Sequence, residues 1–127
     1  MKAVKTGITH TFEATITPQQ SAINVGSGAV EVLGTPAMIA LMEKASNLLM
    51  DPYFDEGETS VGTLVDVRHM KPTAIGATIK VSAKLTECVD GRKLTFEIWA
   101  EDEGGEVGRG TLKRAVINKE KFMARLK

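Results

Sequence analysis

The chain is poor in the residues that build metal sites and disulfides. Its 127 residues include one cysteine, Cys88, and two histidines, His10 and His69. A structural zinc site usually needs four cysteine or histidine ligands, so we expect no bound metal. A single cysteine cannot form an internal disulfide, which fits a reducing compartment.

An excess of charge of one sign and long apolar runs are also missing. Sixteen Lys and Arg residues balance sixteen Asp and Glu residues, so no broad positive field exists to attract nucleic acid or an acidic membrane. The longest apolar run, residues 37–42, is far shorter than the roughly 20 residues that span a bilayer. The first residues contain no apolar stretch of secretory-signal length. We therefore expect a soluble, cytoplasmic protein that binds neither nucleic acid nor membrane.

Several common catalytic motifs do not occur. The chain has no phosphate-binding glycine loop with its lysine, no dinucleotide fingerprint after a strand and no serine elbow. Their absence excludes P-loop nucleotide hydrolysis and the α/β-hydrolase mechanism.

The composition and the apolar pattern predict one globular α+β domain over residues 1–127. Hydrophobic residues make up 43% and charged residues 25%, as in soluble domains of this length. Period-two alternation predicts strands, with Asp90-Gly91 as a hairpin turn and with Gly108 and Gly110 expected at β-bulges. The predicted strands cover residues 8–16, 60–69, 77–86, 93–100 and 106–117. Because short turns join most of them, we expect an antiparallel sheet.

One long helix is predicted between the first two strands. Thr35 is the expected N-cap and Pro36 the first helical residue, and Asp51-Pro52 ends the helix. A glycine-containing loop precedes it, and Asn118 is expected to cap a short terminal helix. The apolar stripe is broad, which indicates a helix wrapped by a sheet. Its residues are Met38, Leu41, Met42, Ala45 and Leu49, widened by Ala37, Ile39 and Leu48.

Three residues stand out as candidates for chemistry, each with an ordinary structural alternative. Alternation places His69 on the apolar face of its strand, where it is either a proton shuttle or a core histidine. Glu43 lies in a mixed sector of the helix, which is either solvated or buried against a second subunit. Thr35 at the helix start lies beside backbone donors that would stabilise an oxyanion.

Basic residues gather near the predicted strand ends. Such charges usually form solvated edges that discourage sheet aggregation, or they hold the phosphates of a carrier such as coenzyme A. The group consists of Lys71, Arg92, Lys93, Lys113 and Arg114.

These features together resemble the hot-dog-fold acyl-CoA thioesterases, in particular the branch that includes fluoroacetyl-CoA thioesterase. The resemblance is carried by residues 34–43, Gly62-Thr63 and residues 67–69. It continues through residues 90–94 and 114–122. Its most specific element is a threonine eight residues before a glutamate on one helix, followed by a histidine on the next strand.

The resemblance implies a long central helix wrapped by an antiparallel sheet of about five strands. It implies hydrolysis of a small acyl-CoA, with Thr35, Glu43 and His69 as catalytic residues and Gly62 offering its backbone to the thioester. Members of the family form dimers with sites at the subunit interface, and no cofactor is implied beyond the coenzyme A of the substrate. Arg92, Lys93 and Arg114 are then the expected phosphate contacts.

One segment departs from the family pattern. The fluoroacetyl-specific enzyme carries phenylalanines before the threonine, whereas residues 26–30 here contain none, so we expect an unfluorinated acyl group. Two alternatives remain open: a hot-dog hydratase or dehydratase acting on acyl-CoA, and a noncatalytic acyl-CoA-binding module.

Overall fold

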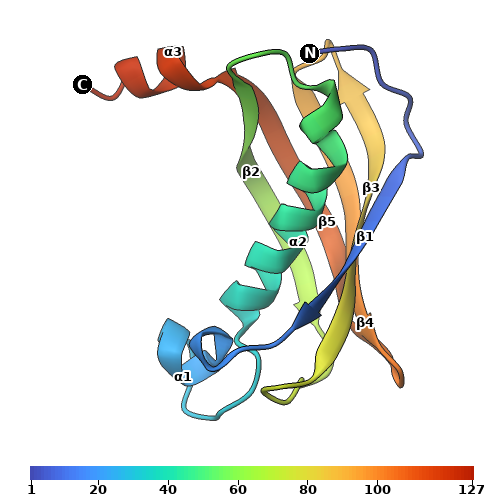
Figure 1. Cartoon of the computed structure of the whole chain (residues 1–127), viewed down its shortest axis with the longest axis vertical. Coiled ribbons are helices and arrows are strands. Elements are labelled where there is room, and N and C mark those ends of the chain that lie inside the picture. The colour runs from blue at the N-terminus through green and yellow to red at the C-terminus, as the bar shows by residue number, and fades with distance from the viewer.

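Five alternating segments form one antiparallel sheet, as the sequence predicted. The computed structural model describes residues 1–127, and Figure 1 shows the sheet curving around a long helix. The strand order is β1-β3-β4-β5-β2, so β1 and β2 are the edges. The strands are β1 (Thr9–Thr15), β2 (Glu58–His69), β3 (Thr78–Val89), β4 (Lys93–Asp102) and β5 (Gly105–Asn118).

The long helix, α2 (Thr35–Met50), lies in the concave face of the sheet (Figure 1). All five residues of its expected apolar stripe are buried, facing apolar residues of β3 and β4. Those residues are Ile79, Val81, Ala83, Leu85, Leu94, Phe96, Ile98 and Ala100. The predicted widening to Leu48 is wrong, since this residue is 36% exposed, whereas Ala37, about as far from the centre of the stripe on the same side, is buried as predicted. The arrangement is the hot-dog fold that the resemblance implied.

The start of α2 differs from the prediction. The N-cap is Gly34, and Thr35 is the first helical residue. The Gly34 carbonyl accepts from the Met38 N–H at 3.0 Å. A Cβ at Gly34 would lie 3.1 Å from the Ala22 Cα, so close packing favours glycine at the cap. The Thr35 hydroxyl is thereby free for another partner.

Two short helices occupy part of the segment expected to be a loop. They are η1 (Pro18–Gln20) and α1 (Ala22–Val25), and the Ser21 side chain caps α1 by accepting from the Asn24 N–H at 3.1 Å. After α2 come η2 (Asp51–Tyr53) and, at the end of the chain, α3 (Lys119–Ala124), which Asn118 caps as predicted. No helix is both long and apolar enough to cross a membrane.

A β-bulge in β2 changes which residues face the helix. The register between β2 and β5 shifts between Gly62 and Leu64. Before the bulge the even-numbered residues of β2 face the helix, and after it the odd-numbered residues do. Ser60 is therefore buried, and Val61 is not on the face of His69 as alternation had predicted.

The bulge expected at Gly108 is confirmed, because the register between β4 and β5 shifts at Val107, directly before this glycine. The bulge expected at Gly110 does not occur, since this residue pairs in register with both β2 and β4. Both glycines allow atoms of neighbouring segments to approach the β5 backbone closely. A Cβ at Gly110 would lie 2.1 Å from the Asp66 carbonyl oxygen, and one at Gly108 would lie 2.6 Å from the Met38 sulfur.

Candidate functional site

The first residue of α2 meets the last residue of β2. Thr35 Oγ1 and His69 Nδ1 are 2.7 Å apart, which is hydrogen-bond distance. The other ring nitrogen of His69, Nε2, is buried and has no hydrogen-bond partner. Because buried polar atoms are nearly always paired, an unpaired imidazole nitrogen beside a helix N-terminus indicates that His69 has a functional rather than a purely structural role.

The environment of His69 favours the neutral imidazole. Burial lowers the pKa of His69 from its ordinary value of 6.5, and the backbone of Lys71 partly opposes this shift. Removing a cation from water costs free energy, so the ring is uncharged at neutral pH.

A hollow of about 350 Å³ lies beside this pair. Its wall includes Gly28, Val30 and Met70 together with Thr35 and His69, and no phenylalanine, tyrosine or tryptophan lines it. The hollow therefore joins the Thr35–His69 pair to the segment in which the sequence departs from the family pattern.

Glu43, two turns further along α2, belongs to a separate cluster. Its Oε2 accepts from Arg114 Nη1 at 2.5 Å. Arg114 also donates from Nε to Ser60 Oγ at 2.8 Å and from Nη2 to the Ser60 carbonyl at 2.7 Å. Ser60 Oγ in turn donates to Asn47 Oδ1 at 3.1 Å.

The place of Arg114 differs from the prediction, which put it at a solvated strand end. Arg114 is only 6% exposed, because it lies on the helix-facing side of β5 with Leu112 and Val116. Three donated bonds to Glu43 and Ser60 compensate the burial of this charge. In this structure Arg114 orients a carboxylate and is not at the surface to meet a phosphate.

Gly62 lies against the same carboxylate. A Cβ at this position would be 2.8 Å from Glu43 Oε2, so only glycine leaves room for the Glu43 side chain in this position. That side chain is 35% exposed, and its second oxygen, Oε1, accepts no hydrogen bond from the protein. The carboxylate thus has one oxygen held by Arg114 and one oxygen free.

One chain does not bring all three candidate residues together. Thr35 and Glu43 are eight residues apart on α2, which is about 12 Å along a helix axis. The structure joins Thr35 to His69 and Glu43 to Gly62, but it leaves these two groups apart.

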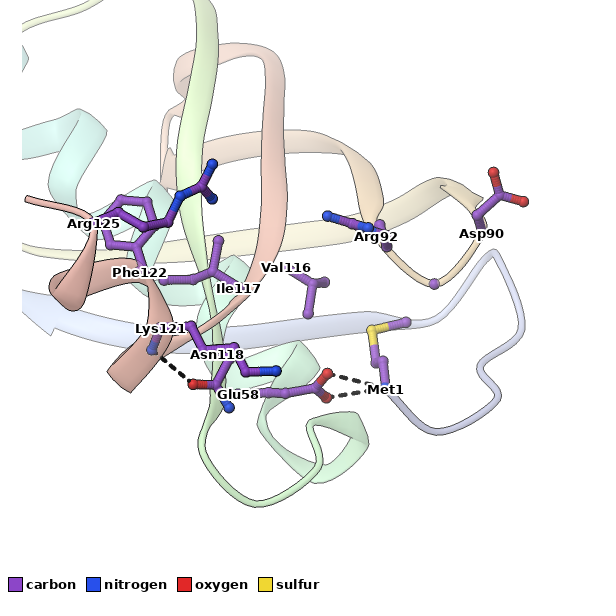
Figure 2. A pocket seen from close by; sticks show the side chains of 11 residues that line it. Met1, Glu58, Asp90, Arg92, Val116, Ile117, Asn118, Lys121, Phe122 and Arg125 are labelled. Atoms are coloured by element: carbon purple, nitrogen blue, oxygen red, sulfur yellow. Dashed lines mark hydrogen bonds and ion pairs between the residues drawn. The ribbon is translucent and has the colours of Figure 1, made fainter.

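The remaining candidates, Arg92 and Lys93, lie at the other end of the sheet. Arg92 follows the Asp90-Gly91 turn, where both residues have positive φ, and it lines a second hollow (Figure 2). Lys93 is exposed at the start of β4 and does not line it.

Sequence reasoning missed the Ser60–Asn47 part of the Glu43 cluster. Alternation alone assigned Ser60 to the polar face, and only the bulge after Gly62 turns it inward. The one available signal was the glycine itself, because glycine inside a strand often marks a bulge or a close approach.

Comparison with known proteins identifies the family. The family described as fluoroacetyl-CoA-specific thioesterase matches residues 16–120. A fluoroacetyl-CoA thioesterase from Streptantibioticus cattleyicolor is 43% identical over 97 residues, which are 76% of this chain and 69% of that protein.

Solved structures agree with this match. The structure of the fluoroacetyl-CoA thioesterase FlK superposes with a TM-score of 0.92 at 34% identity, covering 98% of this chain and 96% of that one. A thioesterase superfamily member from Thermus thermophilus, TTHA0967, gives a TM-score of 0.87 at 26% identity, with 99% and 93% covered. The chain belongs to the fluoroacetyl-CoA-specific thioesterase family.

Proposed function

We propose that this protein hydrolyses a small acyl-CoA to the free acid and coenzyme A. The observation that carries the proposal is the Glu43 carboxylate, which Arg114 holds against Gly62 with Oε1 unengaged, in a member of a thioesterase family. A mutant of FlK has been solved with fluoroacetate and CoA, at a TM-score of 0.88 and 36% identity to this chain. That complex supports an acyl-CoA as the substrate class here.

A homodimer would complete the site. β2 is an edge strand, and its middle residues Leu64 and Val65 are 45% and 42% exposed. Exposed apolar edge strands invite pairing with another chain, and two identical edges pair around a two-fold axis. An antiparallel β2 pair centred between Val65 and Asp66 places Gly62 of one protomer opposite the partner's His69. Glu43 of one chain would then act with the partner's Thr35 and His69.

Within such a site each residue has a defined role. The free oxygen of Glu43 either attacks the thioester carbonyl carbon or takes a proton from the water that attacks it. The backbone donors at the start of α2 stabilise the negative charge that develops on the carbonyl oxygen, while the Thr35 hydroxyl gives its one hydrogen to His69 and orients the ring. With its proton on Nε2, His69 accepts from Thr35 at Nδ1 and has Nε2–H available for the leaving thiolate.

The acyl group is proposed to occupy the 350 Å³ hollow beside Thr35 and His69. Its lining near residues 26–30 consists of small and aliphatic side chains such as Gly28 and Val30. We therefore propose an unfluorinated acyl group of small size, which needs no aromatic contact at this position.

Thiol release across a panel of acyl-CoAs tests the function. We expect short acyl-CoAs to release free coenzyme A, detected with a colorimetric thiol reagent, and enoyl-CoA absorbance to stay unchanged. Loss of enoyl absorbance without thiol release would show a hydratase. Saturable binding of acyl-CoA without turnover would show a noncatalytic module, and either result overturns the proposal.

The pH profile tests the role of neutral His69. Because burial lowers the pKa of His69 below 6.5, the neutral form persists as pH falls through 6.5 and is lost only at lower pH. We therefore expect kcat/KM to be flat around neutral pH and to fall with an apparent pKa below 6.5. NMR titration of the His69 ring should give the same pKa.

The second histidine provides the control for this profile. His10 lies on β1 and has no contact with Thr35, so His10→Gln should keep the profile. An acidic limb centred above pH 6.5, or a limb with an unchanged apparent pKa in the residual activity of His69→Gln, would contradict the assignment.

A further inference from the structure

The second hollow, about 430 Å³ in volume, lies at the opposite end of β2 from His69. Figure 2 shows its two sides: Asp90 and Arg92 come from the β3–β4 turn, while Phe122 comes from α3 and Arg125 directly follows that helix. Glu58, the first residue of β2, lies between them. The terminal helix, which projects from the sheet in Figure 1, therefore forms one wall of a concave site.

Three of the four cations of this hollow have no carboxylate partner, whereas the fourth, the Met1 ammonium, is paired with Glu58 and Asp55. Arg92, Lys121 and Arg125 line it and take part in none of the ion pairs of the structure, whereas Lys71 and Arg109 elsewhere on the surface are paired with carboxylates. Two carboxylates also line the hollow. Glu58 Oε1 is engaged by the Asp55 N–H at 2.8 Å, and Asp90 is in the turn. Three unpaired cations against these two groups favour an anionic ligand.

An apolar surface accompanies these charges. The ring of Phe122 is half-buried and lies next to Ile117 and Val116 in the lining. An aromatic face beside cations is the combination that binds a base together with its phosphates, because the ring stacks on the base and the cations pair with phosphate oxygens.

We propose that this hollow binds the phosphorylated adenosine of the acyl-CoA substrate, an inference that rests on the proposed function. Arg92, Lys121 and Arg125 contact the phosphates, and Phe122 contacts the adenine. Arg92 was expected at a phosphate from the sequence, whereas the α3 residues were not.

The length of coenzyme A decides which catalytic residues this site can serve. Glu58 and Gly62 are four residues apart on β2, about 13 Å at the rise of a strand. The pantetheine arm reaches about as far as five extended residues, ~17 Å, so the thioester can arrive at Glu43. His69 of the same chain is eleven residues from Glu58, about 36 Å, and is out of reach. The nucleotide and Glu43 therefore belong to one protomer, and Thr35 and His69 to the other.

The test removes two charges from the hollow and compares substrates with and without the nucleotide. In Lys121→Ala/Arg125→Ala we expect KM for the best acyl-CoA to rise at least about tenfold, because each charged contact is worth roughly that factor, with kcat within about twofold. The corresponding acyl-pantetheine should show unchanged kcat/KM. The control, Lys119→Ala/Lys127→Ala, removes equal charge from the same terminal segment outside the hollow and should match wild type.

Calorimetric binding of coenzyme A and of adenosine 3′,5′-bisphosphate separates this proposal from the proposed function. A tenfold weaker affinity in the double variant supports the subsite even if no thioester is hydrolysed. If wild type hydrolyses acyl-CoA but the Lys121→Ala/Arg125→Ala variant binds these nucleotides as tightly as wild type does, the subsite is wrong and the function stands. An equal rise in KM for acyl-CoA and acyl-pantetheine would also overturn the subsite.

Discussion

Replacing Glu43 by glutamine is expected to lower kcat for acyl-CoA hydrolysis by about a thousandfold, since a positioned base or nucleophile contributes roughly that much. The amide keeps an oxygen that can accept from Arg114, and the side-chain volume is unchanged. What is lost is the carboxylate oxygen Oε1, which has no hydrogen bond in the structure and is the group available to attack or to activate water. Thiol release under saturating substrate measures the effect.

Two controls separate catalysis from folding in this experiment. The variant should unfold within about 5 °C of wild type by circular dichroism, because the Arg114–Ser60 bonds remain. Glu13→Gln makes the same charge change at an exposed position on β1 and should leave kcat unaltered. A loss of less than tenfold in a folded Glu43→Gln protein would remove Glu43 from the mechanism.

The same residue can distinguish the two chemical routes. If Glu43 attacks, the carbonyl carbon forms an anhydride with Oε1 as the thiolate leaves, and water then cleaves the anhydride. In a single turnover in ¹⁸O-labelled water, cleavage at the Glu43 carbonyl places label in the protein. Direct attack by water places label only in the product acid.

The sequence was sufficient for the elements of this fold because each depends on a local pattern. A strand with one buried face alternates in sequence, and α2 repeats its apolar residues with helical spacing. The positive φ of Asp90 and Gly91 likewise follows from a two-residue turn. These properties need no knowledge of what each element packs against.

The features that the sequence did not predict depend on contacts between distant segments. The bulge after Gly62 turns Ser60 inward, and nothing in the local alternation differs from that of a regular strand. Arg114 looked like a solvated edge cation because its carboxylate partner lies 71 residues away. Gly34 caps α2 in place of Thr35, since the close packing against Ala22 favours glycine there and His69 engages the threonine hydroxyl.

Mixing two inactive variants should restore activity, which is the sharpest test of how the site is built. Glu43→Gln lacks the carboxylate but keeps the Thr35–His69 pair. His69→Ala keeps the carboxylate but lacks the imidazole of that pair. If each site takes Glu43 from one chain and Thr35–His69 from the other, a mixed dimer contains one intact site. Statistical exchange makes half the dimers mixed, so activity should return to about a quarter of wild type.

This recovery distinguishes a site shared between two chains from a site within one chain, because the second arrangement predicts no recovery of activity. A chain that carried all three residues in its own site would leave every site in the mixture defective, and activity would stay at the level of the separate variants. The 12 Å between Thr35 and Glu43 along α2 argues against that arrangement. Exchange is verified with differently tagged chains purified over both tags, and a doubly tagged mixed dimer is expected to have about half of wild-type activity, because one of its two sites is intact. Inactive doubly tagged dimers would show that the geometry of the site has been assigned to the wrong chains.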